Sequence, residues 1–208
     1  MKLYFVRHGR TVWNLEGRFQ GAGGDSPLLE ESIETLKKLG KYLQEIPFDV
    51  IYSSDLPRAV TSAQIIQSQL KDSCPLKETP SLREWQLGKL EGEKFATLKA
   101  IYPEQMNALR SNLAKFDSTM FGAESVYQTT QRTIHFVKSL QNQNFDHVLI
   151  VGHGANLTAS IQSLLGYDTH LLKKDGGLAN ASLTIIETDD FETFTLKTWN
   201  DTSYQEND

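Results

Sequence analysis

Histidine and arginine residues follow apolar segments in this sequence, at positions where they could transfer a phosphoryl group. Residues 3–14 read Leu-Tyr-Phe-Val-Arg-His-Gly-Arg-Thr-Val-Trp-Asn, so an apolar run leads directly into Arg7, His8 and Gly9. Histidine can act as a covalent nucleophile that divides one difficult displacement into two easier steps. The planar guanidinium of arginine matches phosphate oxygens in a bidentate way, and glycine lets the backbone approach a substrate closely. This triplet also occurs by chance, so its meaning depends on partners elsewhere in the chain.

Two distant segments supply such partners. The apolar run of residues 50–54 is followed by Arg58, and the run of residues 148–151 is followed by His153. Apolar runs of this length, each followed by a helical pattern, predict strands of a parallel sheet that is buried on both faces. Ligands of open α/β sheets bind outside the carboxyl ends of the strands. We therefore expect two histidines and two arginines to converge at one sheet edge, where they would form a phosphate site containing a nucleophile.

The remaining patterns predict an α/β fold with a mostly parallel central sheet, helices on both faces, an edge hairpin and a small helical cap insert. Apolar residues at helical spacing predict helices over residues 29–43, 57–70, 106–116, 126–140 and 157–165. A short strand over residues 77–79 and a hairpin formed by residues 182–187 and 193–199 are expected to complete the sheet.

Six groups of residues occur in an order that is typical of one enzyme family. They are Arg7-His8-Gly9 with Thr11 and Asn14; Ser53-Ser54-Asp55-Leu56 with Arg58-Ala59, Thr61 and Ala63; Leu82-Arg83-Glu84; Gly88 with Glu91-Gly92; Gly122-Ala123-Glu124-Ser125; and Gly152-His153-Gly154. On these residues the chain resembles the histidine phosphatase family, also called phosphoglycerate mutase-like. The resemblance spans nearly the whole chain and implies a single histidine phosphatase domain over residues 1–208.

The resemblance also implies a role for each site residue. His8 resembles the residue that becomes transiently phosphorylated, and Glu84 resembles the acid that protonates the leaving oxygen and later takes a proton from water. The residues that resemble the phosphate-binding set are Arg7, Arg58 and His153. The remaining wall of the substrate site is expected to contain Asn14, Gln20, Gly21, Thr11 and Gly154.

Physical chemistry makes these roles reasonable without a metal or another cofactor. Phosphoryl transfer mainly requires in-line positioning and neutralisation of charge on the equatorial oxygens, which two arginines and an imidazole can provide. One nitrogen of His8 must be unprotonated to attack, so we expect the other to donate to a backbone carbonyl. Pro57 predicts that Arg58 lies in the first turn of a helix. Glu84 needs a pKa high enough to hold a proton, which a bound phosphate dianion would favour and the arginines would oppose.

Other titratable residues are assigned no catalytic role. His135, His147 and His170 lack a comparable sequence context. Arg83 is expected to be a structural ion-pair partner, and Glu124 is expected to lie at a helix start, where its charge is favourable. Arg10 and Arg18 are interpreted as cations at the rim of the site.

The composition favours a cytoplasmic enzyme that acts on small molecules. The formal net charge of −5 argues against a nucleic-acid or anionic-membrane surface. Cys74 is the single cysteine, so the chain has no intramolecular disulfide, which fits a reducing compartment. We see no membrane-spanning apolar run and no room for a signal peptide before the first expected strand. The polar residues 200–208 are expected to form a disordered tail.

The length of one insertion indicates whether this chain is expected to act as a mutase or as a phosphatase of the family. Mutases of the family carry a long lid between the acidic glutamate and the Gly-x-Glu-Ser segment, whereas only residues 85–121 lie there in this chain, with residues 93–121 as the expected cap. A short insert leaves a phosphohistidine open to water, so we predict a phosphomonoester hydrolase of a small phosphorylated metabolite. A cofactor-dependent phosphoglycerate mutase and a non-catalytic phospho-recognition protein remain alternatives. The physiological ester, and the choice between a monomer and a homodimer, are left open.

Two departures from the family pattern concern substrate preference. Position 10 is arginine, where relatives usually have glutamate or glutamine, and residues 21–25 read Gly-Ala-Gly-Gly-Asp, where many relatives have an aromatic residue before the aspartate. An added cation beside a glycine-rich wall suggests the hypothesis that a more anionic or bulkier ester is preferred. An unchanged ranking of substrates in Arg10→Gln would refute it.

Overall fold

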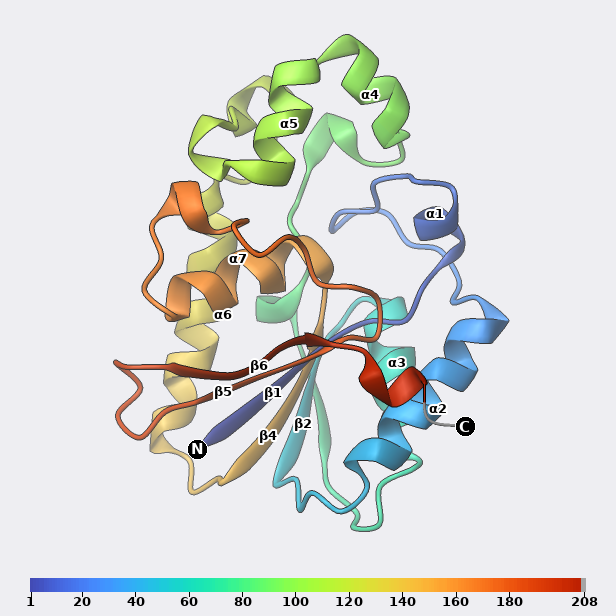
Figure 1. The fold of residues 1–208 in the computed structure, drawn as a ribbon, viewed down its shortest axis with the longest axis vertical. Helices are drawn as coiled ribbons and strands as arrows, with labels where there is room; N and C mark the ends of the chain where they lie inside the picture. Colours follow the sequence, from blue (N-terminus) through green and yellow to red (C-terminus); the bar gives the residue numbers. More distant parts are fainter. Residues whose placement is uncertain (207–208) are drawn as a thin grey trace.

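The structure, a computed structural model, describes residues 1–206 and contains a six-stranded sheet between helices (Figure 1). The strands are β1 (Lys2–Arg7), β2 (Val50–Ser54), β3 (Leu76–Thr79), β4 (His147–Gly152), β5 (Leu183–Glu187) and β6 (Thr195–Asp201). Their order is β3-β2-β4-β1-β5-β6; the first four are parallel, and β5 and β6 form an antiparallel edge hairpin. The predicted α/β fold with a mostly parallel sheet is confirmed.

The strand register brings the candidate site residues to one edge of the sheet. Val6 of β1 and Ser53 of β2 both pair with Val151 of β4. The three parallel strands therefore end at nearly the same level. As a result, the turns that carry His8, Arg58 and His153 leave the sheet side by side.

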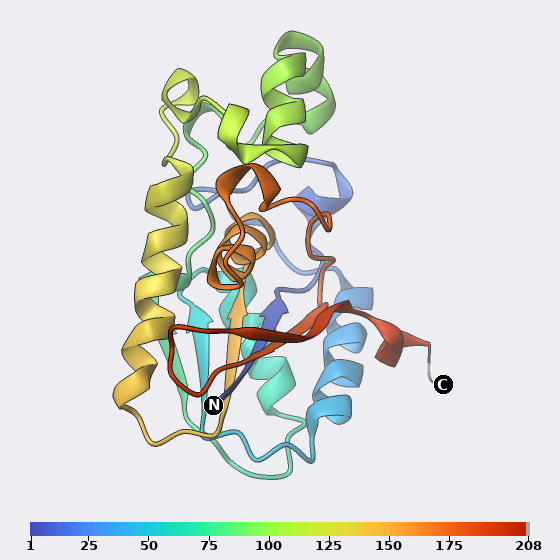
Figure 2. The ribbon, with the colours of Figure 1, turned by 60° about the vertical axis from the view of Figure 1, so that its left-hand side comes forward.

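Helices cover both faces of the sheet, because both sets of alternating strand residues are apolar. On one face α2 (Glu30–Leu43) and α3 (Pro57–Gln67) pack on Tyr4 and Val6, together with their neighbours on β2 and β4. On the other face α6 (Val126–Ser139) and α7 (Gly154–Leu164) pack on Leu3 and Phe5 (Figure 2). Burial on both faces explains why the strands read as continuous apolar runs.

The insert between residues 93 and 121 has a hydrophobic core of its own above the carboxyl edge of the sheet (Figure 1). It contains α4 (Phe95–Ile101) and α5 (Pro103–Ser111), and a further short helix, α1 (Val12–Leu15), lies nearby. Trp85, Met106 and Leu113 are fully buried in this cluster, which Leu172 joins from the segment after α7. The insert is thus packed against the segments that flank the candidate site.

The expectation of a disordered tail over residues 200–208 is wrong for residues 200–206. Strand β6 extends to Asp201, and the backbone N–H of Asn200 donates to Thr184 Oγ1 at 3.0 Å. Tyr204 is buried, and its hydroxyl donates to the carbonyl of Ala181 at 2.6 Å. One aromatic side chain therefore anchors a segment whose average composition is polar. Residues 207 and 208 lie outside the described residues.

Within the described part, no helix is long and apolar enough to cross a lipid bilayer.

Candidate active site

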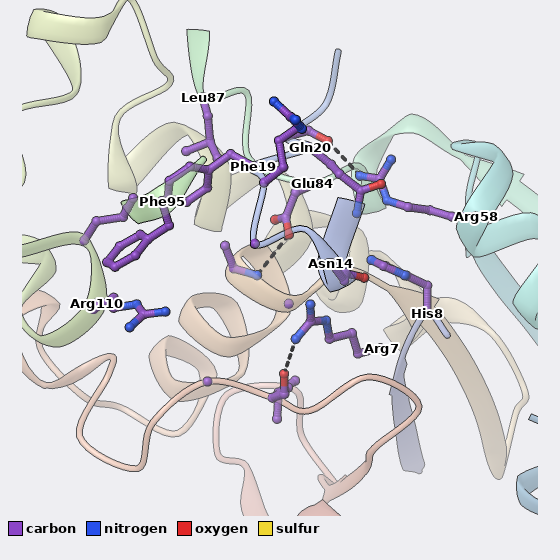
Figure 3. A pocket seen from close by; sticks show the side chains of 18 of the residues that line it. Arg7, His8, Asn14, Phe19, Gln20, Arg58, Glu84, Leu87, Phe95 and Arg110 are labelled. Atoms are coloured by element: carbon purple, nitrogen blue, oxygen red, sulfur yellow. Dashed lines mark hydrogen bonds between the residues drawn. The ribbon is translucent and has the colours of Figure 1, made fainter. Parts of the chain in front are cut away.

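A cavity of about 520 Å³ lies at the carboxyl edge of the sheet, and Phe95, Leu109 and Arg110 of the insert form part of its lining. Eight of the ten residues predicted for the site line it, and Thr11 and His153 do not. Figure 3 shows His8 and Arg58 on one side of this cavity, Phe95 and Arg110 on the other, and Glu84 between them. The lining residues predicted from the sequence are Arg7, His8, Asn14, Gln20, Gly21, Arg58, Glu84 and Gly154.

His8 is buried and held in one orientation by the turn after β1. Its backbone N–H donates to the carbonyl of Gly152 at 2.9 Å, and its Nδ1 lies 2.7 Å from the carbonyl oxygen of Gly9. A carbonyl can only accept, so Nδ1 carries the proton and Nε2 keeps its lone pair. Burial and, to a smaller extent, the charges of Arg7 and Arg58 hold the pKa of His8 well below its usual value of 6.5. His8 is therefore neutral at neutral pH, as a nucleophile must be.

The two arginines are fixed by backbone carbonyls beside His8. Arg7 donates from Nη1 to the carbonyl of Leu178 at 2.6 Å. Its guanidinium lies so close to Gly154 that a Cβ there would stand 2.8 Å from Arg7 Nε. Arg58 lies in the first turn of α3, next to the N1 proline, as predicted. Its terminal nitrogens donate to the carbonyls of Gly21 and Gly24, each at 2.7 Å, and to Asp25 Oδ1 at 2.8 Å.

Three buried nitrogen atoms near His8 have no hydrogen-bond partner within residues 1–206. They are Arg7 Nε, Arg58 Nε and His153 Nδ1. His153 is fully buried, its ring centre is 5.2 Å from that of His8, and its Nε2 lies 2.8 Å from Ser54 Oγ. Burial, followed by the charge of Arg58, holds the pKa of His153 well below 6.5. Because buried polar groups are almost always paired, these unpaired nitrogens on residues around His8 suit an anion such as phosphate.

Glu84 is held at the N-terminus of α7, the helix that begins directly after His153. Its Oε1 accepts from the backbone N–H groups of Trp85 and Asn156, both at 2.8 Å, and its Oε2 accepts from that of Ala155 at 3.0 Å. The favourable end of the helix dipole therefore faces the carboxyl group. These donors orient Glu84 toward the cavity, across from His8 (Figure 3).

Thr11 does not line the cavity but orients Asn14, which does. The Oδ1 atom of Asn14 accepts from the backbone N–H of Thr11 at 3.2 Å, from its hydroxyl at 3.1 Å and from Asn180 Nδ2 at 3.1 Å. The amide nitrogen of Asn14 is therefore left to donate into the site. In Gln20, Oε1 accepts from Ser26 Oγ at 3.0 Å, which orients the Gln20 amide in the same way.

The residues that were assigned no catalytic role lie mostly outside the cavity. Arg83 forms the expected ion pair, through two hydrogen bonds of 2.7 and 2.6 Å to Asp55. Glu124 directly precedes Ser125, the N-cap of α6, so it lies at a helix start as predicted, but it is outside the first turn and pairs with Arg132 at 3.0 Å. Arg10 lies 3.6 Å from Glu31 and does not line the cavity, whereas Arg18 does.

Four residues at or near the site were missed by sequence reasoning. Asp25 pairs with Arg58, and Asn180 contacts Asn14 and the carbonyl of His8 at 3.1 Å. Arg110 and Lys173 add two cations to the cavity lining. Lys173 and Asn180 belong to loops with no recognisable motif, so only the folded chain shows their proximity. Asp25 ends the glycine-rich segment that departs from the family pattern, but nothing in the sequence marks it as the partner of Arg58.

The carboxyl edge of this α/β sheet gathers two histidines, two arginines and a glutamate. The chain therefore falls into the class of α/β proteins that have a histidine-based anion site. The sequence profile of the histidine phosphatase superfamily (branch 1) matches residues 3–202. The chain belongs to this superfamily.

Named relatives include both phosphatases and mutases. The chain is 30% identical over 182 residues to the uncharacterized phosphatase PhoE of Bacillus subtilis (strain 168), covering 88% of this chain and 86% of the relative. It is 32% identical over 192 residues to the probable phosphoglycerate mutase GpmB of Proteus mirabilis (strain HI4320), covering 90% and 85%. The structure of YhfR from Bacillus stearothermophilus is similar with a TM-score of 0.88, 29% identity and 98% coverage of both chains.

Proposed function

We propose that the protein hydrolyses a small phosphomonoester through a phosphohistidine intermediate on His8, without a metal ion. The observation that carries the proposal is the neutral, oriented His8 beside three buried nitrogens that lack hydrogen-bond partners within residues 1–206. The cationic and polar groups around His8 match the demands of phosphoryl transfer, which are positioning and neutralisation of charge.

In the first step, Nε2 of His8 attacks the phosphorus atom, and the bond between phosphorus and the ester oxygen breaks. Arg7, Arg58 and His153 neutralise charge on the equatorial oxygens. His153 donates from Nδ1, because Ser54 Oγ accepts from the backbone N–H of Leu56 at 3.3 Å and can direct its own proton to His153 Nε2. Glu84 gives its proton to the leaving oxygen, so that a neutral alcohol departs.

In the second step, a water molecule attacks the phosphohistidine. Glu84, now a carboxylate, accepts a proton from this water, and the bond between phosphorus and His8 Nε2 breaks. Inorganic phosphate leaves, and His8 returns to its neutral form. The same two residues therefore serve both steps in opposite directions, and each is fixed by backbone hydrogen bonds before substrate binds.

Hydrolysis competes with transfer of the phosphoryl group to a second alcohol, which would make the protein a mutase. One relative is named a probable phosphoglycerate mutase, and this name favours the second candidate function. The short insert favours water as the acceptor, because residues 93–121 leave little chain to build a lid that retains an intermediate.

The proposal is tested by measuring phosphate release from a panel of phosphometabolites with a chelator present. We expect release by the wild type and a loss of more than about 10³-fold in His8→Ala, since the nucleophile is gone. Release that stops on chelation would contradict metal independence. No release from any ester would contradict hydrolysis, and an assay for isomerisation of 3-phosphoglycerate would then separate a mutase from a protein that only binds phosphate.

A further inference from the structure

The cavity is larger than a phosphate group requires. Its volume of about 520 Å³ falls within the range of roughly 300–1,000 Å³ that is typical of metabolite sites. His8 and Arg58 occupy one side, and Phe95, Leu109 and Arg110 of the insert occupy the other (Figure 3). The alcohol part of a bound ester would therefore extend from His8 past Glu84 toward the insert.

Arg110 is positioned to meet that part of the substrate. Its guanidinium carbon lies 3.8 Å from the ring centre of Phe95, which supports it by a cation–π contact, and its charged end points toward the centre of the cavity. No acidic side chain within residues 1–206 pairs with it. Arg18, the other cavity cation outside the phosphate set, instead binds Glu16 and the carbonyl of Gly92, at 2.9 and 2.6 Å.

Lys173 lines the same cavity from a different segment, near enough to Glu84 and Arg7 for their charges to act on it. It directly follows Leu172, which belongs with Leu109 to the hydrophobic cluster of the insert, and both Lys173 and Arg110 line the cavity. The Lys173 ammonium has no hydrogen bond or ion pair with any residue from 1 to 206. Burial lowers its pKa to about 8, while Glu84 raises that pKa and Arg7 lowers it further. A partly buried ammonium without a partner is unfavourable unless an anion joins it.

The charge balance of the cavity supports the same conclusion. The chain has a formal net charge of −5, yet the lining contains five cations and a single acid, Glu84. Arg7 and Arg58 suffice for the phosphoryl group, and Glu16 compensates Arg18. Arg110 and Lys173 remain as an excess of positive charge in the cavity, with Arg110 on the side of the insert.

We propose that the substrate is a phosphomonoester whose alcohol part carries a second negative group, a carboxylate or another phosphate, bound by Lys173 and Arg110. This inference rests on the proposed function, because the phosphoryl group at His8 sets the direction of the rest of the ester. The hypothesis from the sequence, of a more anionic or bulkier ester, named Arg10 and the glycine-rich residues 21–25. Arg10 lies outside the cavity, so the preference for an anionic ester falls to Lys173 and Arg110 instead.

A competing explanation is that Lys173 acts only on the charge of Glu84. Two esters of similar shape separate the explanations: 4-carboxyphenyl phosphate, which is anionic at its far end, and 4-carbamoylphenyl phosphate, which is neutral there. Their dissociation constants are measured by calorimetry on the His8→Ala variant, which cannot turn them over. We expect the carboxylate ester to bind about tenfold or more tightly, as for a hydrogen bond between charged groups.

Lys173→Gln and Arg110→Gln, each in the His8→Ala background, are expected to reduce this ratio of dissociation constants severalfold toward one. Lys174→Gln is the matched control, because Lys174 is exposed and pairs with Asp175 at 2.6 Å. A ratio near one before substitution, or a ratio that survives both substitutions, would overturn the second subsite. Failure of the proposed hydrolysis is a separate result, seen when wild-type protein binds both esters and cleaves neither.

Discussion

His8 lies between two guanidinium groups in a buried pocket, and this surrounding governs its protonation. Its folded-state pKa is depressed below 6.5, so the folded protein keeps the imidazole neutral at pH values where an exposed histidine gains a proton. As pH falls below 6.5, protonation therefore favours the unfolded chain over the ligand-free folded protein. The same shift keeps Nε2 unprotonated in mildly acidic solution, as the proposed attack on phosphorus requires.

The first prediction concerns pH. Protonation of His8 should not slow its phosphorylation by substrate until the pH is well below 6.5, because burial and the two arginines oppose the added charge. The measurement is an NMR titration of the ring nitrogens of His8 in the free protein, assigned with a His8→Asn variant. Titration of His8 at or above 6.5 would show that the pocket does not hold it neutral.

The second prediction concerns Gly154, whose missing side chain makes room for Arg7. A Cβ at this position would lie 2.8 Å from Arg7 Nε and 2.9 Å from its guanidinium carbon, so Gly154→Ala must displace the guanidinium. Since a misplacement of about 1 Å can cost roughly 10²-fold in rate, we expect kcat/KM to fall by about 10- to 100-fold. Thermal denaturation is measured alongside. Activity equal to that of the wild type would mean that Arg7 is not needed at its observed position.

At the scale of elements, helices α6 and α7 hold the loop that carries Glu84. Arg132 of α6 donates from Nη1 to the carbonyls of Ser81 and Arg83, at 3.1 and 3.0 Å, and from Nη2 to Glu124 at 3.0 Å. Asn156 of α7 donates to the same Arg83 carbonyl at 2.7 Å. The carboxyl group is thus positioned by two helices that are far apart in sequence from the loop.

The third prediction follows from this support. Arg132→Gln should lower kcat for alkyl phosphates by roughly tenfold or more, because a displaced Glu84 protonates a poor leaving group less well. Hydrolysis of 4-nitrophenyl phosphate should fall less, since its leaving group needs little protonation. Arg83→Gln is the control, because its ion pair with Asp55 is half-exposed and such pairs contribute about 0–1 kcal/mol. Equal losses on both substrates would indicate that Arg132 serves only general stability.

The elements that were predictable from the sequence are those built on continuous apolar patterns. The runs at residues 3–6, 50–54 and 148–151 predicted the parallel strands, and the turns after them predicted where His8 and His153 would meet. The supporting contacts were not predictable in this way. Arg132 is one of two lysine or arginine residues on the amphipathic helix α6, and its role exists only because α6 packs beside the Glu84 loop. Tyr204 was missed for a similar reason, since a single aromatic residue in a polar segment shows no periodicity.

At the scale of the whole molecule, an acidic protein surrounds a positively charged cavity. The net charge of −5 belongs to the chain as a whole, while the cations of the lining are concentrated where three strands and the insert meet. Composition alone predicted that nucleic acid would be an unsuitable partner, but it could not locate the local excess of positive charge. That excess depends on loops such as the one bearing Lys173, which only the tertiary fold brings to the cavity.

Detection of the phosphohistidine itself tests the proposed mechanism most directly. A ³²P-labelled phosphomonoester is mixed with the protein, the reaction is quenched within milliseconds in base, and the labelled peptide is identified by mass spectrometry. We expect an acid-labile phosphoryl group on His8 that forms as fast as, or faster than, steady-state turnover and is missing in His8→Ala. Label on another residue, or full turnover with no label on His8, would contradict it.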